Sequence, residues 1–530
     1  MNKKIVIIGS GASGISAALG FEKKGIVPTI LDVGDTNKKT CNVSGNLYDY
    51  RKNNELFDLM IGENLEGLSN ILNGTSLPPK LTSPMNNYII SDDKKYSQLR
   101  TSNFSAIQSF AIGGLAAAWG AGLYRYNESE LQNMPLRSAS LNPFYDALSK
   151  EIGISGQNDD LAPFFGNDDT LLPPVRLSGK AEYLYKKYSK KRDKFNKNGI
   201  FIGYPRIGVL TKNHKGRDKC NYSNFETWLS DIPWVYNPAQ SLNRLIKEDK
   251  VIYRKGIYVE SWNRKNGKII INGKNISDNS PFKTTTDNLI IATGTLNSAK
   301  LILSSKKDTL TKLPILDNPL LQIPVFLPSF LGSPIDKSAF GMTNLNLIFK
   351  SPENGTTLQG SIIELTSPPR SVFFEKFPAS SVMNLKLIKM ISTSLLAMFL
   401  YYPSSKNDAG SIRLNKNNEL EIVQKNLILD KQPVKKIVNA LFGMGALTHP
   451  LIIEQSMQGY AIHYAGTIPM KSKTTSDYES SPDGELHGES GIYIVDGSSF
   501  SHISSKNLSF TIMANSMRIA DKISDKVRRN

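Results

Sequence analysis

The segment Lys4-Ile-Val-Ile-Ile-Gly-Ser-Gly-Ala-Ser-Gly14 decides the fold class, because an apolar run leads directly into the pattern G-x-G-x-x-G. The run Ile5–Ile8 is short and β-branched, which is typical of a strand buried on both faces. The three glycines permit a tight turn, a close approach of backbone N–H groups to a pyrophosphate, and close packing of the following helix, whose N-terminus attracts phosphate. The predicted dinucleotide contacts here are Gly9, Gly11, Ala12, Ser13 and Gly14.

An acidic residue follows at the distance that this pattern requires. A second apolar segment, Val27–Leu31, ends at Asp32, which lies 18 residues after Gly14. A carboxylate in that position is placed to accept hydrogen bonds from ribose hydroxyls. The glycine pattern alone is a weak signal, but strand, glycines, helix and acid in register predict a dinucleotide site.

Length and charge limit the classes of protein that fit. A chain of 530 residues holds two or more domains, or one large domain with a long insertion. The composition, with 40% hydrophobic and 21% charged residues, is that of a globular protein. The net charge of +17 would suit nucleic acid or a membrane surface. The lysines, however, are scattered among asparagines without a basic helix, so we expect no nucleic-acid binding, while attraction to an anionic membrane or substrate stays open.

Cysteine usage and hydropathy bear on location. Cys41 and Cys220 are the only cysteines, which predicts no disulfide framework and a reducing, cytoplasmic compartment. The longest apolar stretch, Ile391–Tyr402, has about half of the roughly 20 residues that a spanning helix needs. We interpret it as a buried helix or the wall of a substrate loop, with a helix lying in a membrane interface as the alternative. Peripheral membrane contact is therefore open.

Segments typical of a nucleotide-binding fold occur at both ends and in the middle of the chain. The first βαβ unit is expected over residues 3–35, and further buried strands are expected at Asn288–Ala292 and Gly491–Val495, each followed by a helix. Strands of a meander are expected at Val251–Ser261 and Lys268–Asn272, with a turn at Asn266-Gly267. Residues 320–425 predict a second, sheet-based region. This layout predicts one nucleotide domain built from separate segments, with a substrate domain inserted in it.

Four blocks of sequence occur in order along the chain. They are Gly9–Gly14 with Asp32, Gly113–Gly120, Ala292–Leu301, and a C-terminal pair formed by His463–Met470 and Val495–Ala514. Through these blocks the chain resembles the glucose–methanol–choline (GMC) flavoprotein oxidoreductases over nearly its whole length. The C-terminal pair is the most specific of the four.

The resemblance implies FAD rather than NAD, and an α/β fold with a discontinuous FAD-binding Rossmann-like domain and an inserted α+β substrate domain with an antiparallel sheet. The expected FAD-binding parts are residues 1–150 (with an excursion at 36–100), 241–310 and 481–530. Residues 151–240 would connect them to a substrate domain at 311–480. The further cofactor contacts that we expect are Gly113, Gly114, Trp119, Gly120, Ile257, Ala292, Gly294, Asp496, Gly497, Asn507, Leu508 and Ser509.

Members of this family oxidise CH–OH groups of alcohols, sugars and sterols by passing hydride to the flavin. At the position of their catalytic pair this chain has His463 and Asn507. Histidine has a suitable pKa for a base that takes the hydroxyl proton. Asparagine can donate a hydrogen bond to the developing alkoxide without competing for its proton. His502 is the competing candidate, and we interpret it as a loop residue.

The sequence departs from some relatives at two points. No histidine precedes His214, so FAD is expected to be bound without a covalent link. Cys220 opens a segment with the spacing C-x₂-C-x₂-C-x₃-C in which the other cysteines are absent. A single thiol cannot hold a cluster or zinc, so no metal is expected.

Two other functions fit the same motifs. The protein could catalyse a net non-redox isomerisation in which the hydride returns to the substrate, or it could be a non-catalytic flavin-binding partner of another protein. Within the leading interpretation, the substrate is open between a lipid-linked or hydrophobic alcohol and an anionic sugar. The electron acceptor (oxygen, quinone or a carrier protein) is not encoded in any motif.

Overall fold

A five-stranded parallel sheet forms the centre of the nucleotide-binding half. The computed structural model describes residues 3–36, 46–47, 71–72, 75–90, 96–226, 228–365 and 390–529. The strand order is β20-β11-β1-β2-β7, and neighbouring strands are parallel. The strands are β1 (Ile5–Ile8), β2 (Thr29–Asp32), β7 (Ile252–Lys255), β11 (Asn288–Ile291) and β20 (Ile492–Ile494). Strands from the start, middle and end of the chain thus form one sheet, as the predicted fold class requires.

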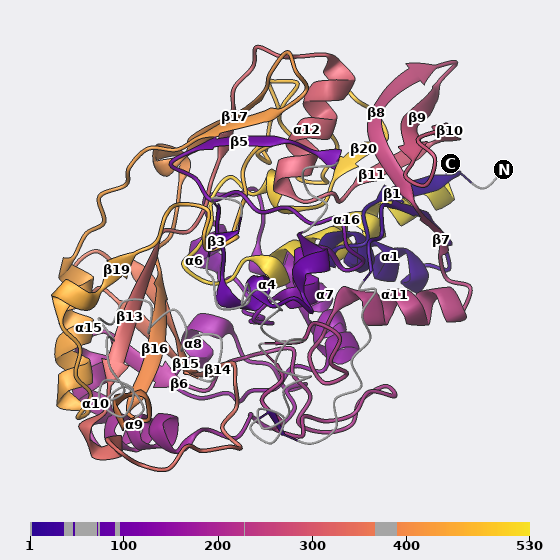
Figure 1. Cartoon of the computed structure of the whole chain (residues 1–530). Helices are drawn as coiled ribbons and strands as arrows, with labels where there is room; N and C mark the ends of the chain where they lie inside the picture. Colours follow the sequence, from indigo (N-terminus) through magenta and orange to yellow (C-terminus); the bar gives the residue numbers. More distant parts are fainter. Residues whose placement is uncertain are drawn as a thin grey trace.

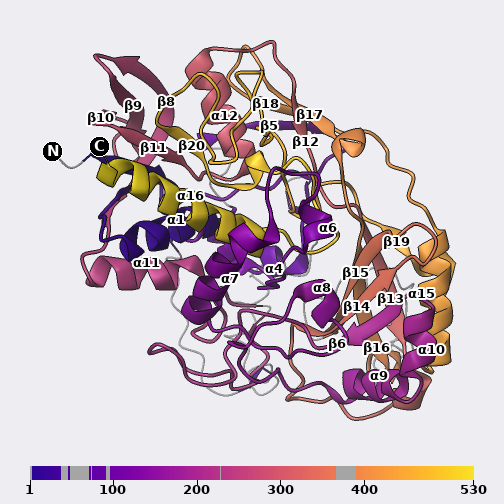
Figure 2. The same ribbon diagram turned by 180° about the vertical axis from the view of Figure 1, so that it is seen from behind.

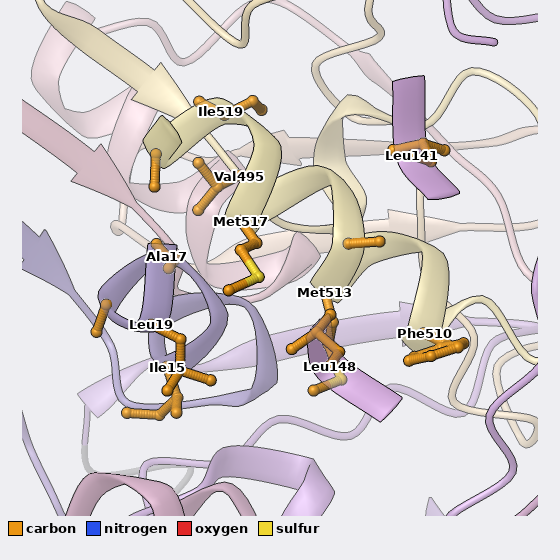
Figure 3. Close-up of a cluster of buried hydrophobic side chains, with 14 of the residues drawn as sticks. Ile15, Ala17, Leu19, Leu141, Leu148, Val495, Phe510, Met513, Met517 and Ile519 are labelled. Carbon is orange, nitrogen blue, oxygen red and sulfur yellow. The ribbon is translucent and has the colours of Figure 1, made fainter. Parts of the chain in front are cut away.

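Helices α1 (Ala12–Lys23) and α16 (Ser509–Arg529) lie side by side on one face of this sheet, next to α7 (Ser138–Ile152) and α11 (Pro238–Lys247) (Figures 1 and 2). Side chains from α1, α7 and α16 meet in one buried cluster (Figure 3). At Gly20 an added Cβ would lie 2.8 Å from the Met517 carbonyl oxygen, so a glycine is needed where the two long helices touch. The final helix, α16, buries an apolar face that comprises Phe510, Met513, Ala514, Met517 and Ala520.

The opposite face of the parallel sheet is covered by α12 (Thr295–Lys306) and by a three-stranded antiparallel sheet. That sheet contains β8 (Ile257–Lys265), β9 (Lys268–Asn275) and β10 (Pro281–Thr286). Successive residues of a strand point to opposite faces, and both faces are covered here, which is why β1 is apolar throughout. Ile5 and Ile7 pack with the α1–α16 cluster, whereas Val6 and Ile8 pack with α12.

The segment predicted as one strand of a meander divides at Gly256, which has a φ of 83°. The part before it is β7 and joins the edge of the parallel sheet, and the part after it begins the hairpin β8–β9. The turn predicted at Asn266-Gly267 is confirmed, with φ values of 51° and 72° between the paired residues Lys265 and Lys268. The interpretation as one strand was therefore only half correct, because the glycine redirects the chain from one sheet into another.

A six-stranded antiparallel sheet forms the other half of the molecule, in the order β19-β13-β16-β15-β14-β6 (Figure 1). Its strands are β6 (Ile200–Gly203), β13 (Leu320–Phe326), β14 (Thr343–Lys350), β15 (Thr357–Glu364), β16 (Leu395–Tyr401) and β19 (Glu454–Gln455). Helices α9 (Gly179–Ser189), α10 (Arg192–Lys197) and α15 (Gln432–Gly443) contribute side chains to the core on one side of it.

The interpretation of Ile391–Tyr402 as a helix is wrong. Its main part is β16, which lies between β13 and β15 in the sheet. The stretch is apolar on both of its faces because one face enters the core with α9 and α15 and the other lines a cavity. An apolar run alone does not distinguish such a strand from a buried helix. In the described part of the chain, no helix is long and apolar enough to cross a membrane.

The remaining elements connect these units, and the domain boundaries expected from the sequence stay a prediction. A four-stranded sheet in the order β12-β17-β18-β5 contains β5 (Leu99–Ser102), β12 (Leu313–Ile315), β17 (Gly410–Leu414) and β18 (Leu420–Val423). Short elements are β3 (Ile71–Leu72), β4 (Thr75–Ser76), α4 (Pro79–Thr82), η2 (Asn87–Ile89), η3 (Gly114–Ala118), α6 (Glu128–Leu131), α8 (Ala162–Phe165), η4 (Pro328–Phe330), η5 (Lys406–Asp408), η6 (Pro450–Ile452) and η7 (Gly497–Ser499).

Candidate active site

A cavity of about 1250 Å³ lies between the two halves of the molecule. On one side it is lined by the carboxyl ends of β1, β2 and β11, and on the other by β13, β15 and β16. Ligands of open parallel sheets bind at the carboxyl ends of the strands, so the location agrees with the glycine pattern. The sequence-predicted site residues all line this cavity, with the exception of Gly14.

The glycine loop after β1 is shaped by close backbone contacts. Gly9 has a φ of 99°, and a Cβ there would lie 2.6 Å from the Ala292 carbonyl oxygen. A Cβ on Gly14 would lie 2.0 Å from the Gly9 carbonyl oxygen, so Gly14 permits helix α1 to approach the turn from behind the cavity. A Cβ on Gly11 would meet only the Gly113 carbonyl oxygen, at 4.0 Å, on the cavity side.

Helix α1 begins at this loop without a side-chain cap at Gly11. The N–H groups of the first helical turn have no partner within the helix, and together with the helix dipole they attract negative charge. The Gly9–Ser13 backbone lines the cavity where these groups emerge. The loop therefore forms a backbone cradle that fits a phosphate or pyrophosphate.

The carboxylate of Asp32 lies at the end of β2, buried beside this loop. It accepts hydrogen bonds from the Ser10 hydroxyl and, at 3.0 Å, from the Tyr253 hydroxyl on β7. Burial raises the pKa of Asp32 to about 6. Tyr253 was not predicted as a neighbour, because nothing in the local sequence indicates that β7 lies next to β2.

The Gly113–Gly120 segment lies over the glycine loop as a 3-10 helix, η3. A Cβ on Gly113 would lie 2.3 Å from Asn237 Oδ1, and a Cβ on Gly114 would lie 3.4 Å from the Gly11 Cα. The indole N–H of Trp119 donates to the Tyr236 carbonyl oxygen at 2.7 Å. Packing against protein thus requires a glycine at 113, the φ of 59° favours a glycine at 114, and the same segment also lines the cavity.

A cluster of aromatic side chains at the cavity was not predicted. Tyr258, next to Ile257 on β8, stacks on Tyr96 with ring centroids 5.5 Å apart, and it meets the edge of Phe110 at 6.0 Å. Tyr258 and Phe110 line the cavity. The ammonium group of Lys300 donates to the Tyr96 carbonyl oxygen at 3.3 Å, and burial lowers its pKa to about 8. Aromatic spacing in sequence gives no signal for this cluster, because its members come from distant segments.

Asp496 connects the starts of two helical elements. Its carboxylate accepts hydrogen bonds from the Ser498 backbone N–H at 3.0 Å, the Gly294 backbone N–H at 2.9 Å and the Ser298 hydroxyl at 2.5 Å. It caps η7 and holds the loop before α12 against it. The sequence predicted a cofactor contact for Asp496, and the structure shows capping contacts together with a position on the cavity wall.

His463 is buried, with 8% of its surface exposed, and its Nδ1 lies 2.9 Å from Asn318 Oδ1. The orientation of the Asn318 amide follows from its other contacts, because Nδ2 donates to the carbonyl oxygens of Tyr402 at 2.6 Å and Ser504 at 2.8 Å. Oδ1 is then the acceptor, and Nδ1 of His463 must carry the hydrogen. In this tautomer the other ring nitrogen, Nε2, has a free lone pair.

Burial lowers the pKa of His463 to about 4, below the near-neutral value expected from the residue type. The imidazole is therefore neutral at physiological pH. The Tyr401 ring lies 5.2 Å from the His463 ring and adds to its burial. The backbone is held by Asp317, whose carboxylate accepts the N–H groups of His463 at 3.1 Å and Gly459 at 2.6 Å. Burial raises the pKa of Asp317 to about 7.

Asn507 presents a polar group to the same cavity. Its Oδ1 is buried and is among the side-chain atoms of the described residues that have no hydrogen-bond partner. The next two residues, Leu508 and Ser509, also line the cavity at the start of α16. His502, the competing candidate, is not among the cavity-lining residues, although burial lowers its pKa too.

Two further polar groups near the cavity bear on cofactor and metal binding. The Lys80 ammonium lines the cavity and donates to the Trp119 carbonyl oxygen at 2.8 Å, and burial lowers its pKa to about 8. Burial, together with the neighbouring Glu226 carboxylate, raises the pKa of the Cys220 thiol. Among the described residues no group of three or more His, Cys, Asp or Glu is arranged to hold a metal ion. Cys41 lies outside the described residues.

Comparisons with known proteins give one clear result. No family model matches the sequence, and no curated protein matches it. Among solved structures, the crystal structure of pyridoxine 4-oxidase from Mesorbium loti matches with a TM-score of 0.61 and 12% sequence identity, covering 100% of each chain. At this identity the match establishes the fold over the whole chain.

Proposed function

We propose that the protein is an FAD-dependent oxidoreductase that oxidises a CH–OH group, with His463 as the base. The observation that carries this proposal is that the phosphate cradle at Gly9–Ser13 and the buried His463 line one cavity. The fold, shared with an oxidase over the whole chain, supports it. FAD bound without a covalent link and a small-molecule alcohol are the proposed ligands.

The residues of the cavity fit a dinucleotide. Its volume of about 1250 Å³ exceeds the roughly 300–1000 Å³ of ordinary ligand pockets, which leaves room for a cofactor and a substrate. The uncapped N-terminus of α1 would hold the pyrophosphate, and Asp32 would accept the ribose hydroxyls. When bound, the flavin supplies the acceptor for a hydride from the substrate carbon.

The chain's own residues supply the proton chemistry. The Nε2 lone pair of His463 takes the hydroxyl proton while the C–H bond breaks, and the hydrogen bond from Nδ1 to Asn318 holds the ring in that tautomer. The amide N–H₂ of Asn507 can donate to the oxygen as its negative charge develops. The first turn of α16, at Leu508 and Ser509, places a positive helix end at the cavity.

The test is anaerobic bleaching of the flavin in the purified holoenzyme, with panels of alcohols, sugars and sugar nucleotides. Bleaching by one class, with recovery on adding an acceptor such as oxygen or a quinone, would support CH–OH oxidation. A fully loaded flavin that none of these compounds bleaches would contradict it. Conversion of a compound without any acceptor would instead indicate the isomerase alternative. Release of free FAD on denaturation would test the non-covalent link.

The pH dependence of flavin reduction should report the buried histidine. A base must be neutral to accept a proton, so activity is lost as the pH falls through the pKa of His463, which is about 4. In rapid pH-jump experiments the titration of His463 is therefore expected to contribute no acid limb to the rate constant between about pH 5.5 and 8. An acid limb near the ordinary histidine pKa of about 6.5 would contradict the lowered pKa of His463.

Asn318 is expected to act as a positioning residue for His463. Asn318→Ala removes the acceptor at Nδ1, and hydrogen bonds to charged groups contribute about 1.5–3 kcal/mol, so flavin reduction at saturating substrate should slow by roughly 10- to 100-fold. FAD content and the substrate dissociation constant should change little, which separates this effect from misfolding. An unchanged limiting rate would show that Asn318 does not assist His463.

A further inference from the structure

The antiparallel sheet gives the cavity an apolar wall. Alternate residues of β13 and β16, such as Val325 and Met398, point into the core with α9 and α15. Their neighbours point the other way and line the cavity. The apolar side chains of this wall are Pro324, Phe326, Ile363, Leu365, Ala397 and Phe399.

Two polar side chains on this wall, one on β13 and one on β15, are already engaged with protein. Gln322 Nε2 donates to the Ser456 hydroxyl at 3.0 Å, and the Ser361 hydroxyl accepts from Asn346 Nδ2 at 3.2 Å. Hydroxyl groups of a sugar placed here would lose water without gaining equivalent partners, and each such loss is unfavourable. The wall therefore disfavours a polyhydroxylated substrate.

Charged side chains that line the cavity stand mostly on the nucleotide side. Lys80 donates to the Trp119 carbonyl oxygen, and Lys300 donates to the Tyr96 carbonyl oxygen. On the side of the antiparallel sheet, the charged lining residue among those described is Glu454, which is exposed at the edge. An anionic group on the substrate would be buried along the wall without a counter-charge, which is costly.

The apolar wall continues to an apolar mouth. Leu451 and Ile452 on η6 line the cavity and are 89% and 53% exposed. Leu447, just before them, pairs with Phe326 at the end of β13. The wall begins near His463, whose ring contacts Tyr401 on β16. It continues along β16 to Leu395, six residues away, which is a length of roughly 20 Å at about 3.3 Å per residue.

From this wall and mouth we propose that the substrate is an uncharged alcohol with an extended apolar body, its hydroxyl-bearing carbon at His463 and its apolar part along the wall toward Leu451 and Ile452. The inference rests on the proposed function. Oxidation transfers two electrons and the hydrogen of the C–H bond to the bound FAD as hydride, and the hydroxyl proton goes to His463. Linear fatty alcohols and isoprenoid alcohols share this chemistry, and the test separates them.

The test is anaerobic flavin reduction in the holoenzyme by linear alcohols from 1-butanol to 1-dodecanol, with geraniol, sorbitol and glucose 6-phosphate in parallel. One buried methylene contributes about 0.8 kcal/mol, so the second-order rate constant should rise about fourfold per methylene until the wall is covered. A larger second-order rate constant for geraniol than for the linear alcohols would indicate a substrate with a branched, isoprenoid body. A rate that does not depend on chain length, or that is as fast with sorbitol or glucose 6-phosphate, would overturn the proposal.

Binding without turnover separates this inference from the proposed function. In the His463→Asn holoenzyme, calorimetry should show that 1-decanol binds more tightly than 1-butanol, with the negative heat-capacity change of apolar burial. If 1-decanol binds more tightly in this way but the flavin of the wild type stays oxidised, the apolar site is supported and the proposed oxidation is refuted. Equal, weak binding of all alcohols would refute the apolar site whatever the flavin does.

A charge placed on the wall tests its location. Ile363 pairs with Ala397, four residues along β16 from Tyr401, so a long alcohol reaches it and a short one does not. Ile363→Asp should lower the ratio of 1-decanol to 1-butanol reactivity by at least about tenfold. Ile428→Asp is the matched control, because Ile428 is 98% exposed and is not among the residues that line the cavity.

If Ile363→Asp loses its flavin or its fold, Ile363→Thr decides the question. Threonine keeps the branched shape and the preference for strands, and it exchanges apolar atoms for a hydroxyl. It should lower the same reactivity ratio by about fourfold, the value of one methylene. If the ratio of 1-decanol to 1-butanol reactivity is unchanged in a folded, FAD-loaded variant, the apolar part of the substrate lies elsewhere and the proposed location is wrong.

Discussion

His463→Asn is expected to slow flavin reduction by about 10²- to 10⁴-fold while the protein keeps its FAD, because a general base contributes a factor of that size. The base is the Nε2 lone pair, which exists because Asn318 accepts the hydrogen on Nδ1. Asparagine keeps a polar group of similar size but cannot take the proton at neutral pH. Stopped-flow bleaching under anaerobic conditions measures the effect, and the absorbance of the oxidised flavin measures FAD content.

The matched control for this variant is His502→Asn. His502 undergoes the same chemical change, its own pKa is also lowered by burial, and it is not among the cavity-lining residues. Its flavin reduction should stay close to that of the wild type. If His502→Asn lost activity and His463→Asn kept it, the assignment of the base would be reversed.

Gly14→Ala is expected to give a protein that binds little or no FAD and unfolds at a lower temperature. The added Cβ would lie 2.0 Å from the Gly9 carbonyl oxygen, so α1 must move away from the turn that forms the phosphate cradle. Overpacking of this kind costs about 1–3 kcal/mol, although alanine in a helix is otherwise favoured over glycine by about 1 kcal/mol. FAD content and the thermal midpoint of unfolding measure the two effects.

Gly179→Ala provides the comparison, since it makes the same change in the first turn of helix α9. Its nearest neighbour would be Phe330 at 3.8 Å, an ordinary contact, and its φ is not positive. It should bind FAD fully and be as stable as the wild type or slightly more stable. Normal FAD content in Gly14→Ala would show that the close approach of α1 is not needed for the cradle.

Four of the five strands of the parallel sheet could be predicted from the sequence because their determinants are local, whereas β7 was assigned to the meander. Each of its strands at Ile5–Ile8, Asn288–Ile291 and Ile492–Ile494 is short, apolar and followed by a glycine or an aspartate at the turn. These signals need no knowledge of distant residues. The interpretation of Ile391–Tyr402 failed for the opposite reason, because the strand is apolar on both faces and its partners, β13 and β15, are what make it a strand.

The candidate site divides in the same way. The glycines, Asp32, His463 and Asn507 belong to motifs, and the structure places them, apart from Gly14, on one cavity. Asn318 and Tyr253 belong to no motif, and they matter only because the fold brings them beside His463 and Asp32. The roles of all these residues in binding and catalysis stay predictions that the variants above are designed to test.

The contact between α1 and α16 also bears on how the chain is made. The apolar face of α1 leaves the ribosome almost 500 residues before its partner residues Met513 and Met517. At about 5–20 residues per second, roughly 25–100 s of synthesis separate the two helices. During that time Ile15 and Leu19 of the nascent βαβ unit lack the packing that α16 later supplies. The phosphate cradle and the first turn of α16 can meet only after residue 509 has been synthesised.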